Sequence, residues 1–268
     1  MNKLKKGEYF GNHNQELRFN NIIITDTEYT HDKVDWHHHE NPYFTYLVEG
    51  KLFEANKKEE YYLNSGNLLF HNWQDAHYNI KPPSYTRGFH IELNPDWFKE
   101  NDICSFNFEG SVKLQNPQII NLVNKIFIET KTNDKHSQLS IEVLLLDLFS
   151  KMTGKSNQHK KKPKWVHTLR ELLTDNPTSN FSLSSLSKEL NIHSAHISRD
   201  FSKYFGTTLG DYIRLQKVNK AMLLIAKKEY TMTEICYMCD FYDQSHFILN
   251  FKRIYKITPT YFLKNSKR

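Results

Sequence analysis

Two stretches in the C-terminal part of the chain repeat one pattern of apolar residues, and this repeat constrains the fold more than any other feature. They are SLSSLSKELNIHSAHISRDFSKYFGTT at 182–208 and TMTEICYMCDFYDQSHFILNFKRIYKITP at 231–259. Each copy has the periodicity of a short helix, a tight turn and a second helix, which is the helix-turn-helix pattern. We therefore predict two helix-turn-helix motifs, at about 183–205 and 232–255. The early apolar positions match at an offset of 49 residues (Leu183, Leu186, Leu190 and Ile192 with Met232, Ile235, Cys239 and Phe241), and the later ones at an offset of 50 (His196, Ile197, Phe201 and Phe205 with His246, Phe247, Phe251 and Tyr255).

The residues at the turns and at the helix starts support this prediction. A tight turn between two helices needs a positive φ angle, and Asn191 and Asp240 are of the non-glycine types that adopt it most readily. Ser182 and Thr231 precede the first helix of each copy and can cap it. Residues 210–228 have helical periodicity, so we expect one long helix that holds the two motifs at a fixed distance.

The N-terminal part of the chain has the pattern of short β-strands separated by turn residues. Closely spaced short strands are typical of an antiparallel sandwich or barrel. Two helices are expected to follow, at 117–131 and 137–152, because apolar residues recur there at helical spacing. In the second of these, Leu139, Val143, Leu146 and Phe149 form an apolar stripe, which is either intrachain core or a dimer face. The expected strands are at 22–25, 43–48, 52–55, 61–63, 67–71 and 85–93.

A polar segment at 154–164, GKSNQHKKKPK, separates these two parts. It has a lysine run, a glycine and a proline but no periodicity, so we expect an interdomain linker. The predicted fold class is α+β. The first domain, residues 1–153, would hold a barrel at about 1–110 and the helix pair at about 117–152, and the second, all-α domain would occupy 165–268.

Charge and composition narrow the class of protein. Residues 1–154 have a net charge of −5 and residues 155–268 a net charge of +11. A basic second domain favours nucleic-acid binding, although a solvated basic surface would give the same balance. Three thinly spread cysteines fit a reducing compartment, and there is neither a signal-peptide pattern nor an apolar run of membrane-spanning length. We therefore expect a cytoplasmic protein that is not inserted in a membrane.

The second repeat, from Ile235 to Pro259, resembles the signature of the AraC/XylS family of bacterial transcription regulators, and the resemblance covers roughly residues 165–265. The first repeat adds FSKYFGTTLGDYI at 201–213, followed by the family's pattern in the connecting helix. Four residues depart from the family pattern: Asp240 and Lys256 in place of common glycines, and Lys217 and Leu249 in place of common arginines. The matching residues in the second repeat are Ile235, Cys239, Phe241, Asp243, Gln244, Ser245, Phe247, Phe251, Lys252, Thr258 and Pro259.

The resemblance implies that both motifs bind one face of double-stranded promoter DNA and enter adjacent major grooves, which recur about every 34 Å. Arg199 could pair with a guanine and Gln244 with an adenine, whereas apolar side chains could contact a thymine methyl group. For each residue the alternative is a solvated helix surface. The expected base contacts are Ala195, Ser198, Arg199, Gln244, Ser245 and Leu249, and the expected phosphate contacts are Lys203, Lys252 and Arg253.

Cys236 and Cys239 form a C-x-x-C pattern, which in other chains marks redox or zinc sites. Here both lie on the first helix of the second motif, and the chain has no second cysteine pair. We therefore predict that they are buried core residues.

The family resemblance also implies an N-terminal barrel of the cupin type that binds an effector and dimerises. His37 and His39 of the stretch DWHHHENPY share one face of a strand, and His77 could join them. A metal-binding cupin also needs a glutamate several residues later, but Glu40 is too close and YFTYLV follows at 43–48. We therefore predict no metal, no cofactor and a small organic effector. The expected pocket residues are His37, His39, Tyr46, Trp73, His77 and His90.

The sequence thus predicts a ligand-responsive, DNA-binding transcription regulator rather than an enzyme. Its expected partners are promoter DNA, an effector and, for an activator, RNA polymerase, with a homodimer left open. Two alternatives remain: a regulator whose barrel only dimerises, and a metal-dependent cupin enzyme with a DNA-binding tail.

Overall fold

The computed structural model describes residues 2–72, 74–103, 110–153, 163–175, 179 and 181–266. The chain divides into two compact units, residues 1–152 together with 266–268, and residues 153–265. The predicted linker at 154–164 lies outside the described residues except for its last two positions, and a helix begins at Lys164. The domain boundaries drawn from the sequence remain a prediction.

The first unit contains two β-sheets. The five-stranded sheet has the order β1-β4-β9-β6-β7 and the six-stranded sheet the order β11-β8-β5-β10-β3-β2. All pairings are antiparallel except that of β1 with β4. The predicted β domain followed by helices is therefore confirmed. The strands are β1 (Asn2–Leu4), β2 (Asn12–Phe19), β3 (Ile22–Glu28), β4 (Lys33–His39), β5 (Tyr43–Glu49), β6 (Lys51–Asn56), β7 (Glu60–Asn64), β8 (Leu68–His71), β9 (His77–Ile80), β10 (Arg87–Leu93) and β11 (Ser111–Leu114).

Strands β1, β2, β9 and β11, and the short helix α1 (Pro95–Glu100), were not expected from the sequence. Strand β2 shows the reason most clearly, because its sequence NHNQELRF is mostly polar and its residues are exposed or half-buried. It is the edge strand of its sheet, where only one face and one neighbour constrain the side chains. Apolar periodicity detects a buried face, so it fails for such strands.

The two sheets pack face to face through apolar side chains. Leu47 and Leu69 from the six-stranded sheet are buried against Leu52, Tyr61 and Leu63 from the five-stranded sheet. Strand β5 alternates, so Tyr43, Thr45 and Leu47 face the space between the sheets. This alternation decides which side chains line the interior of the barrel.

The helix pair α2 (Pro117–Thr132) and α3 (Ser137–Thr153) covers the other face of the six-stranded sheet. Phe127 of α2 packs edge-on against Phe89, and Phe149 of α3 packs against Phe44. An ion network fixes α2 further, because both Arg87 of β10 and Lys131 of α2 donate to the buried carboxylate of Asp26 on β3.

The apolar stripe predicted on the second helix is only partly core. Phe149 is 1% exposed, whereas Leu139, Val143 and Leu146 are 64%, 57% and 40% exposed. The intrachain-core alternative therefore holds for Phe149 alone among the four.

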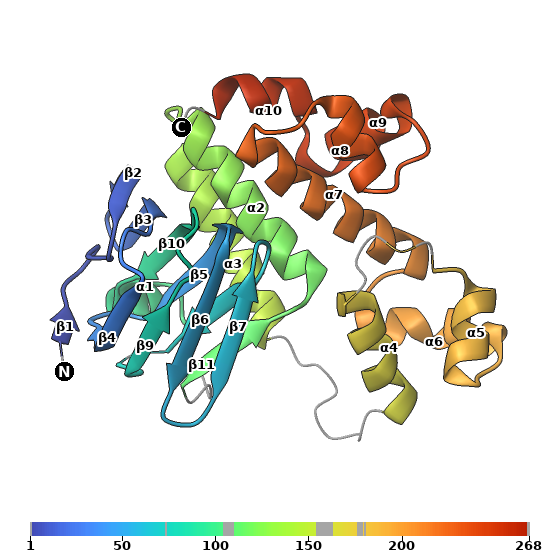
Figure 1. Ribbon diagram of the computed structural model, residues 1–268, viewed down its shortest axis with the longest axis horizontal. Coiled ribbons are helices and arrows are strands. Elements are labelled where there is room, and N and C mark those ends of the chain that lie inside the picture. The colour runs from blue at the N-terminus through green and yellow to red at the C-terminus, as the bar shows by residue number, and fades with distance from the viewer. Residues whose placement is uncertain are drawn as a thin grey trace. The chain divides into compact units, whose positions relative to one another are not determined.

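The second unit is all helical, and it contains both predicted helix-turn-helix motifs. The long helix α7 joins them, with α5 and α6 at one end and α8 and α9 at the other (Figure 1). The helices are α4 (Lys164–Asp175), α5 (Leu183–Leu190), α6 (Ser194–Phe205), α7 (Leu209–Lys227), α8 (Met232–Met238), α9 (Gln244–Tyr255) and α10 (Pro259–Asn265).

The turn and cap chemistry predicted from the sequence is confirmed. Asn191 and Asp240 adopt the left-handed conformation, with φ angles of 51° and 56°. Ser182 and Thr231 each cap a helix and form a capping box with the residue three positions later. In each motif, the turn between the two helices is therefore made with an asparagine or an aspartate in the left-handed conformation instead of a glycine.

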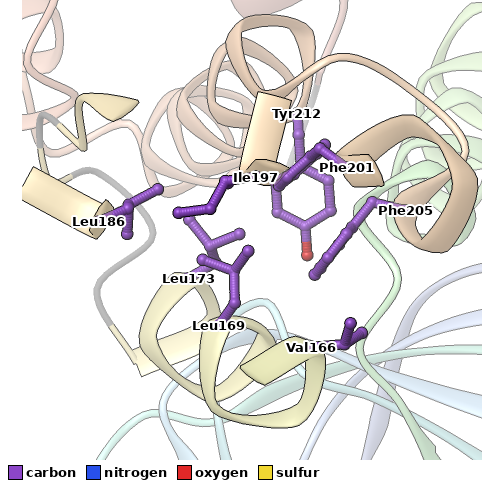
Figure 2. Close-up of a cluster of buried hydrophobic side chains, with 8 residues drawn as sticks. All are labelled: Val166, Leu169, Leu173, Leu186, Ile197, Phe201, Phe205 and Tyr212. Atoms are coloured by element: carbon purple, nitrogen blue, oxygen red, sulfur yellow. The ribbon is translucent and has the colours of Figure 1, made fainter. Parts of the chain in front are cut away.

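Each motif has its own core. Figure 2 shows the first core, in which side chains from α4, α5, α6 and α7 point toward one another. Its buried residues are Val166, Leu169, Leu173, Leu186, Ile197, Phe201, Phe205 and Tyr212. The second motif buries Ile235, Cys236, Cys239, Phe241, Phe247, Phe251 and Tyr255, and Phe262 of α10 is buried as well. The prediction that Cys236 and Cys239 are buried core residues is thus confirmed.

Candidate DNA-binding surface and barrel pocket

The second helix of each motif has one buried and one exposed face. In α6, Ile197, Phe201 and Phe205 hold the helix to the core. In α9, Phe247, Phe251 and Tyr255 occupy the matching positions. All nine residues predicted to contact DNA lie on the exposed faces of these two helices: Ala195, Ser198, Arg199, Lys203, Gln244, Ser245, Leu249, Lys252 and Arg253.

The two polar side chains predicted to recognise bases are held by neighbours in the free protein. Arg199 donates a hydrogen bond to Nδ1 of His196 at 2.9 Å and another to Asp200 at 3.3 Å. Gln244 donates to the hydroxyl of Thr233, which lies on the first helix of the same motif. Base recognition would require each side chain to exchange these contacts for contacts with DNA.

Helix α7 is hydrogen-bonded to α4 and to the second motif. Gln216 donates to the backbone carbonyl of Leu173 in α4 at 2.8 Å. Lys217 donates to the carbonyl and to the carboxylate of Asp240 at 2.7 Å each, and Asn219 accepts a hydrogen bond from Tyr255 at 2.9 Å. The lysine and aspartate that depart from the family pattern therefore form a pair that fixes the second turn to α7.

The exposed face near the second recognition helix carries apolar side chains that sequence reasoning did not single out. Tyr242 is 89% exposed, Tyr237 is 72% exposed and Leu249 is 66% exposed. Tyr237 lies on α8 and Leu249 on α9, whereas Tyr242 lies in the turn between these helices. The sequence could have indicated these exposed side chains, because Tyr237 and Tyr242 do not fall at the repeated apolar positions that form the core.

The interior of the barrel contains a small cavity of about 30 Å³. Of the six residues predicted for an effector pocket, His37, His39 and His90 line it, and His77 packs against His37 with ring centroids 4.3 Å apart. Tyr46 lies on the opposite face of β5 and is not among the lining residues. Trp73 is outside the described residues.

Four tyrosine and phenylalanine side chains also line the cavity, and sequence reasoning did not identify them. Tyr9 stacks on His90 with ring centroids 3.9 Å apart, and Phe10 packs edge-on against His37. Tyr29 and Tyr43 also line the cavity. Tyr9 and Phe10 come from the segment before β2, so only the folded chain brings them to the histidines.

Burial keeps the interior histidines neutral. Desolvation, followed by the nearby charge of His37, lowers the pKa of His77 to about 3. Desolvation also lowers the pKa of His90 to about 3 and that of His39 well below its usual range. His90 is bonded at both ring nitrogens, to Thr25 at 3.0 Å and to Tyr29 at 2.7 Å.

A buried carboxylate also faces this interior, and sequence reasoning missed it. Glu54 of β6 is 1% exposed, and its Oε1 lies 3.4 Å from Nδ1 of His71 on β8. Only the residues directly after His39 were considered from the sequence, whereas Glu54 arrives from a later strand and lies in a group with His71 and His77. Its position two residues after the buried Leu52 was the available signal, because alternate residues share a face.

Potential metal ligands converge at two places among the described residues. His37, His39 and His77 form one group, and Glu54, His71 and His77 form another, with the ligand atoms of each group within 4.8 Å of one another. Neither group includes a cysteine. No helix in the described part of the chain has the length and apolar character needed to cross a membrane.

Comparison with known proteins agrees with the two motifs. A family model described as a helix-turn-helix domain matches residues 186–265. The TetD protein of transposon Tn10 from Escherichia coli is 36% identical over 70 residues, which are 26% of this chain and 51% of TetD. The chain thus spans about half the length of TetD, and the same holds for the probable transcription factor PqrA of Proteus vulgaris, of which 57% is covered.

Weaker similarity extends over most of the chain. The transcriptional activator RhaS of Escherichia coli is 20% identical over 83% of this chain and 85% of RhaS. The uncharacterised regulator YbfI of Bacillus subtilis is 24% identical over 78% of this chain and 80% of YbfI. The match to a solved structure of ToxT from Vibrio cholerae covers 97% of this chain and 100% of ToxT, at 12% identity and a TM-score of 0.42. The duplicated motif and these relatives together show that residues 186–265 form a helix-turn-helix domain similar to those of AraC-type transcription regulators.

Proposed function

We propose that this protein regulates transcription by binding promoter DNA through α6 and α9 in adjacent major grooves, and that its barrel binds the controlling ligand. The observation that carries the proposal is the pair of recognition helices, each with an exposed polar face: α6 packs against Tyr212 of the single helix α7, and Tyr255 of α9 donates to Asn219 of the same helix. A regulator of this kind acts where the DNA is, so we propose a cytoplasmic location. If it activates transcription, RNA polymerase is a further partner.

The two motifs contribute unequally to sequence recognition in this proposal. Arg199 of α6 offers two parallel donors to a guanine, and Gln244 of α9 offers one donor and one acceptor to an adenine. Ser198 and Ser245 supply shorter polar contacts, whereas Ala195 and Leu249 can contact only a thymine methyl group. Lys203, Lys252 and Arg253 neutralise phosphates and position the helices.

Genome-wide mapping of the binding sites of the full-length protein tests this proposal, since it yields the operator sequence and the neighbouring genes. Affinity for that operator should then fall steeply with salt, because each neutralised phosphate releases counterions. A protein that shows no enriched genomic sites, and no affinity for DNA at low salt, would not be a regulator of this type.

The ligand-binding role of the barrel is supported by the convergence of His37, His39 and His77 beside an interior cavity. The sequence favours a small organic effector, and a thermal-shift screen with sugars and aromatic metabolites tests that choice. A double variant, His37→Ala with His39→Ala, should leave the DNA affinity of the unliganded protein nearly intact and abolish the ligand response. A barrel that only dimerises would give no thermal shift with any ligand.

We further propose that the protein is a homodimer that associates through α3. Leu139, Val143 and Leu146 recur at helical spacing and are all exposed, next to a surface hollow of about 290 Å³ that they line together with Trp97. Exposed apolar stripes of this kind mark association surfaces. A second copy presents the same stripe, so the two faces complement each other about a twofold axis.

A further inference from the structure

The turn before α9 is one residue longer than the turn before α6. The last apolar residues before the two recognition helices, Ile192 and Phe241, match at an offset of 49 residues. The N-cap residues of these helices, His193 and Asp243, match at an offset of 50 residues. Tyr242 is therefore the additional residue, and the first motif has no counterpart of it.

The side chain of Tyr242 extends into solvent from a backbone that is fixed on both sides. Tyr242 is 89% exposed, whereas Phe241 is buried and packs against Phe247 with ring centroids 5.3 Å apart. On the other side, the carboxylate of Asp243 accepts a hydrogen bond from the backbone N–H of His246 at 2.7 Å and so caps α9. Within the described part of the chain, the side chain of Tyr242 makes neither a hydrogen bond nor a ring contact. The free protein thus presents a phenol in a defined place without using it.

Tyr242 directly precedes the end of α9 that enters the major groove in the proposed function. The first residues of a recognition helix reach the base edges, and Gln244 and Ser245 occupy these positions here. A side chain just before them is positioned to reach the sugar-phosphate backbone that borders the groove. The net charge of +11 on residues 155–268 favours phosphates on this surface.

We propose that Tyr242 is an additional DNA contact of the second motif, and that its hydroxyl donates a hydrogen bond to a phosphate at the edge of the groove that α9 enters. Tyrosine is among the side chains that make phosphate contacts. Its apolar ring can lie against a deoxyribose while the hydroxyl at its tip donates. The inference rests on the proposed function, because it adds a contact to the same DNA-binding surface.

This contact offsets a deficit of the second recognition helix. At an offset of 50 residues, Leu249 occupies the position that Arg199 has in the first motif, so α9 lacks the guanidinium that α6 presents. A phosphate contact carries no sequence information. Tyr242 therefore adds affinity and fixes the register of α9 on the DNA, whereas the stronger base preference belongs to α6.

The test compares the full-length variant Tyr242→Phe with the wild type in binding to the operator and to unrelated DNA, over a range of salt concentrations. The substitution removes only the hydroxyl, so affinity for both DNAs should fall roughly 3- to 30-fold, as expected for one hydrogen bond. The dependence on salt should keep the slope of the wild type, because a neutral hydroxyl releases no counterion, whereas Lys252→Ala should make the slope shallower. Tyr62→Phe is the matched control, since Tyr62 is an exposed tyrosine of the barrel unit, and this variant should bind like the wild type.

A second measurement identifies the phosphate. In a set of operators, each with one phosphate replaced by an uncharged methylphosphonate, one acceptor at a time is weakened. At one position bordering the groove of α9, the wild type should lose affinity and Tyr242→Phe should lose much less. Such a difference shows that the hydroxyl and that phosphate interact directly.

Three results with a folded Tyr242→Phe protein would overturn the inference. The first is wild-type affinity for DNA. The second is a loss confined to one base pair of the operator, which would make Tyr242 a base contact. The third is wild-type DNA affinity together with lost activation of the promoter, which would assign Tyr242 to a protein partner. In all three the wild type binds the operator, so the proposed function stands, whereas a wild type without DNA affinity refutes the proposed function and this inference together.

Discussion

The substitution Asp26→Asn should strongly destabilise the barrel unit. Asp26 is 1% exposed and receives two hydrogen bonds from Arg87, at 2.7 and 2.6 Å, and a further one from Lys131. Asparagine has nearly the same shape but no charge, so the variant removes the negative charge to which both buried cations donate. The substitution therefore separates the contribution of the ionic interactions to the stability of the unit from the contribution of side-chain packing.

The expected loss follows from the cost of breaking a buried ion pair by removing one partner, which is about 3–5 kcal/mol. For a unit of about 150 residues, 1 kcal/mol lowers the melting temperature by about 2–4 °C, so the melting temperature of the barrel unit should fall by roughly 6–20 °C. Differential scanning calorimetry and urea denaturation measure this. The control Asp147→Asn removes a half-exposed pair with Lys151 and should cost less than about 1 kcal/mol.

The effect should also depend on pH. Burial opposes ionisation of Asp26, but the hydrogen bond from Arg87 and the charge of Lys131 outweigh it and hold the pKa of Asp26 below its ordinary value. The stabilisation is therefore complete above the unfolded value of about 3.9 and is lost as the pH falls through the folded pKa. The difference between wild type and Asp26→Asn should shrink in that acid range. Equal melting temperatures at neutral pH would refute the reasoning.

Three further outcomes are expected. Arg199→Ala should reduce the free energy of binding to the operator by about 1–3 kcal/mol and relax the preference at one base position. Lys252→Ala should weaken binding to all DNA sequences alike. An unchanged ratio of specific to nonspecific affinity in Arg199→Ala would contradict the assignment of Arg199 as a base contact. In analytical ultracentrifugation, Val143→Glu should shift the protein from dimer to monomer, whereas the control Gln138→Glu, at an exposed position of the same helix, should leave the dimer intact. A Val143→Glu protein that sediments like the wild type would exclude α3 as the dimer interface. Burial raises the pKa of the Cys239 thiol to about 12. In a Cys104→Ser background, Cys236 and Cys239 should therefore react with a thiol reagent at pH 8 only when the protein unfolds. Fast labelling of the folded protein would show that these two cysteines are not core residues.

The DNA-binding unit could be predicted from the sequence because its determinants are local. Helical periodicity, capping residues such as Thr231 and turn residues such as Asn191 act within a few positions, and the repeat showed the same set twice. Periodicity also identified the exposed faces of α6 and α9, since a helix that buries Phe201 or Phe251 must expose the opposite side.

The barrel site could be predicted only in part, because its residues come from many strands. Alternation along one strand correctly placed His37 and His39 together, and both line the cavity. It could not bring Glu54 from β6, His71 from β8 or Tyr9 from the segment before β2 to the same interior. Sheet pairing joins residues that are far apart in sequence, and no local pattern encodes which strands become neighbours.

The sequence by itself therefore determined the two helix-turn-helix motifs, their caps and turns, the β character of the first unit and the shared face of His37 and His39. Only the tertiary structure decided that Tyr46 faces away from the cavity, that Leu139, Val143 and Leu146 stay exposed while Phe149 is buried, and that a carboxylate lies beside the histidines. The physical reason is the range of the interactions: caps and periodicity act within one or two turns of helix, whereas burial and ligand convergence depend on how distant strands pack.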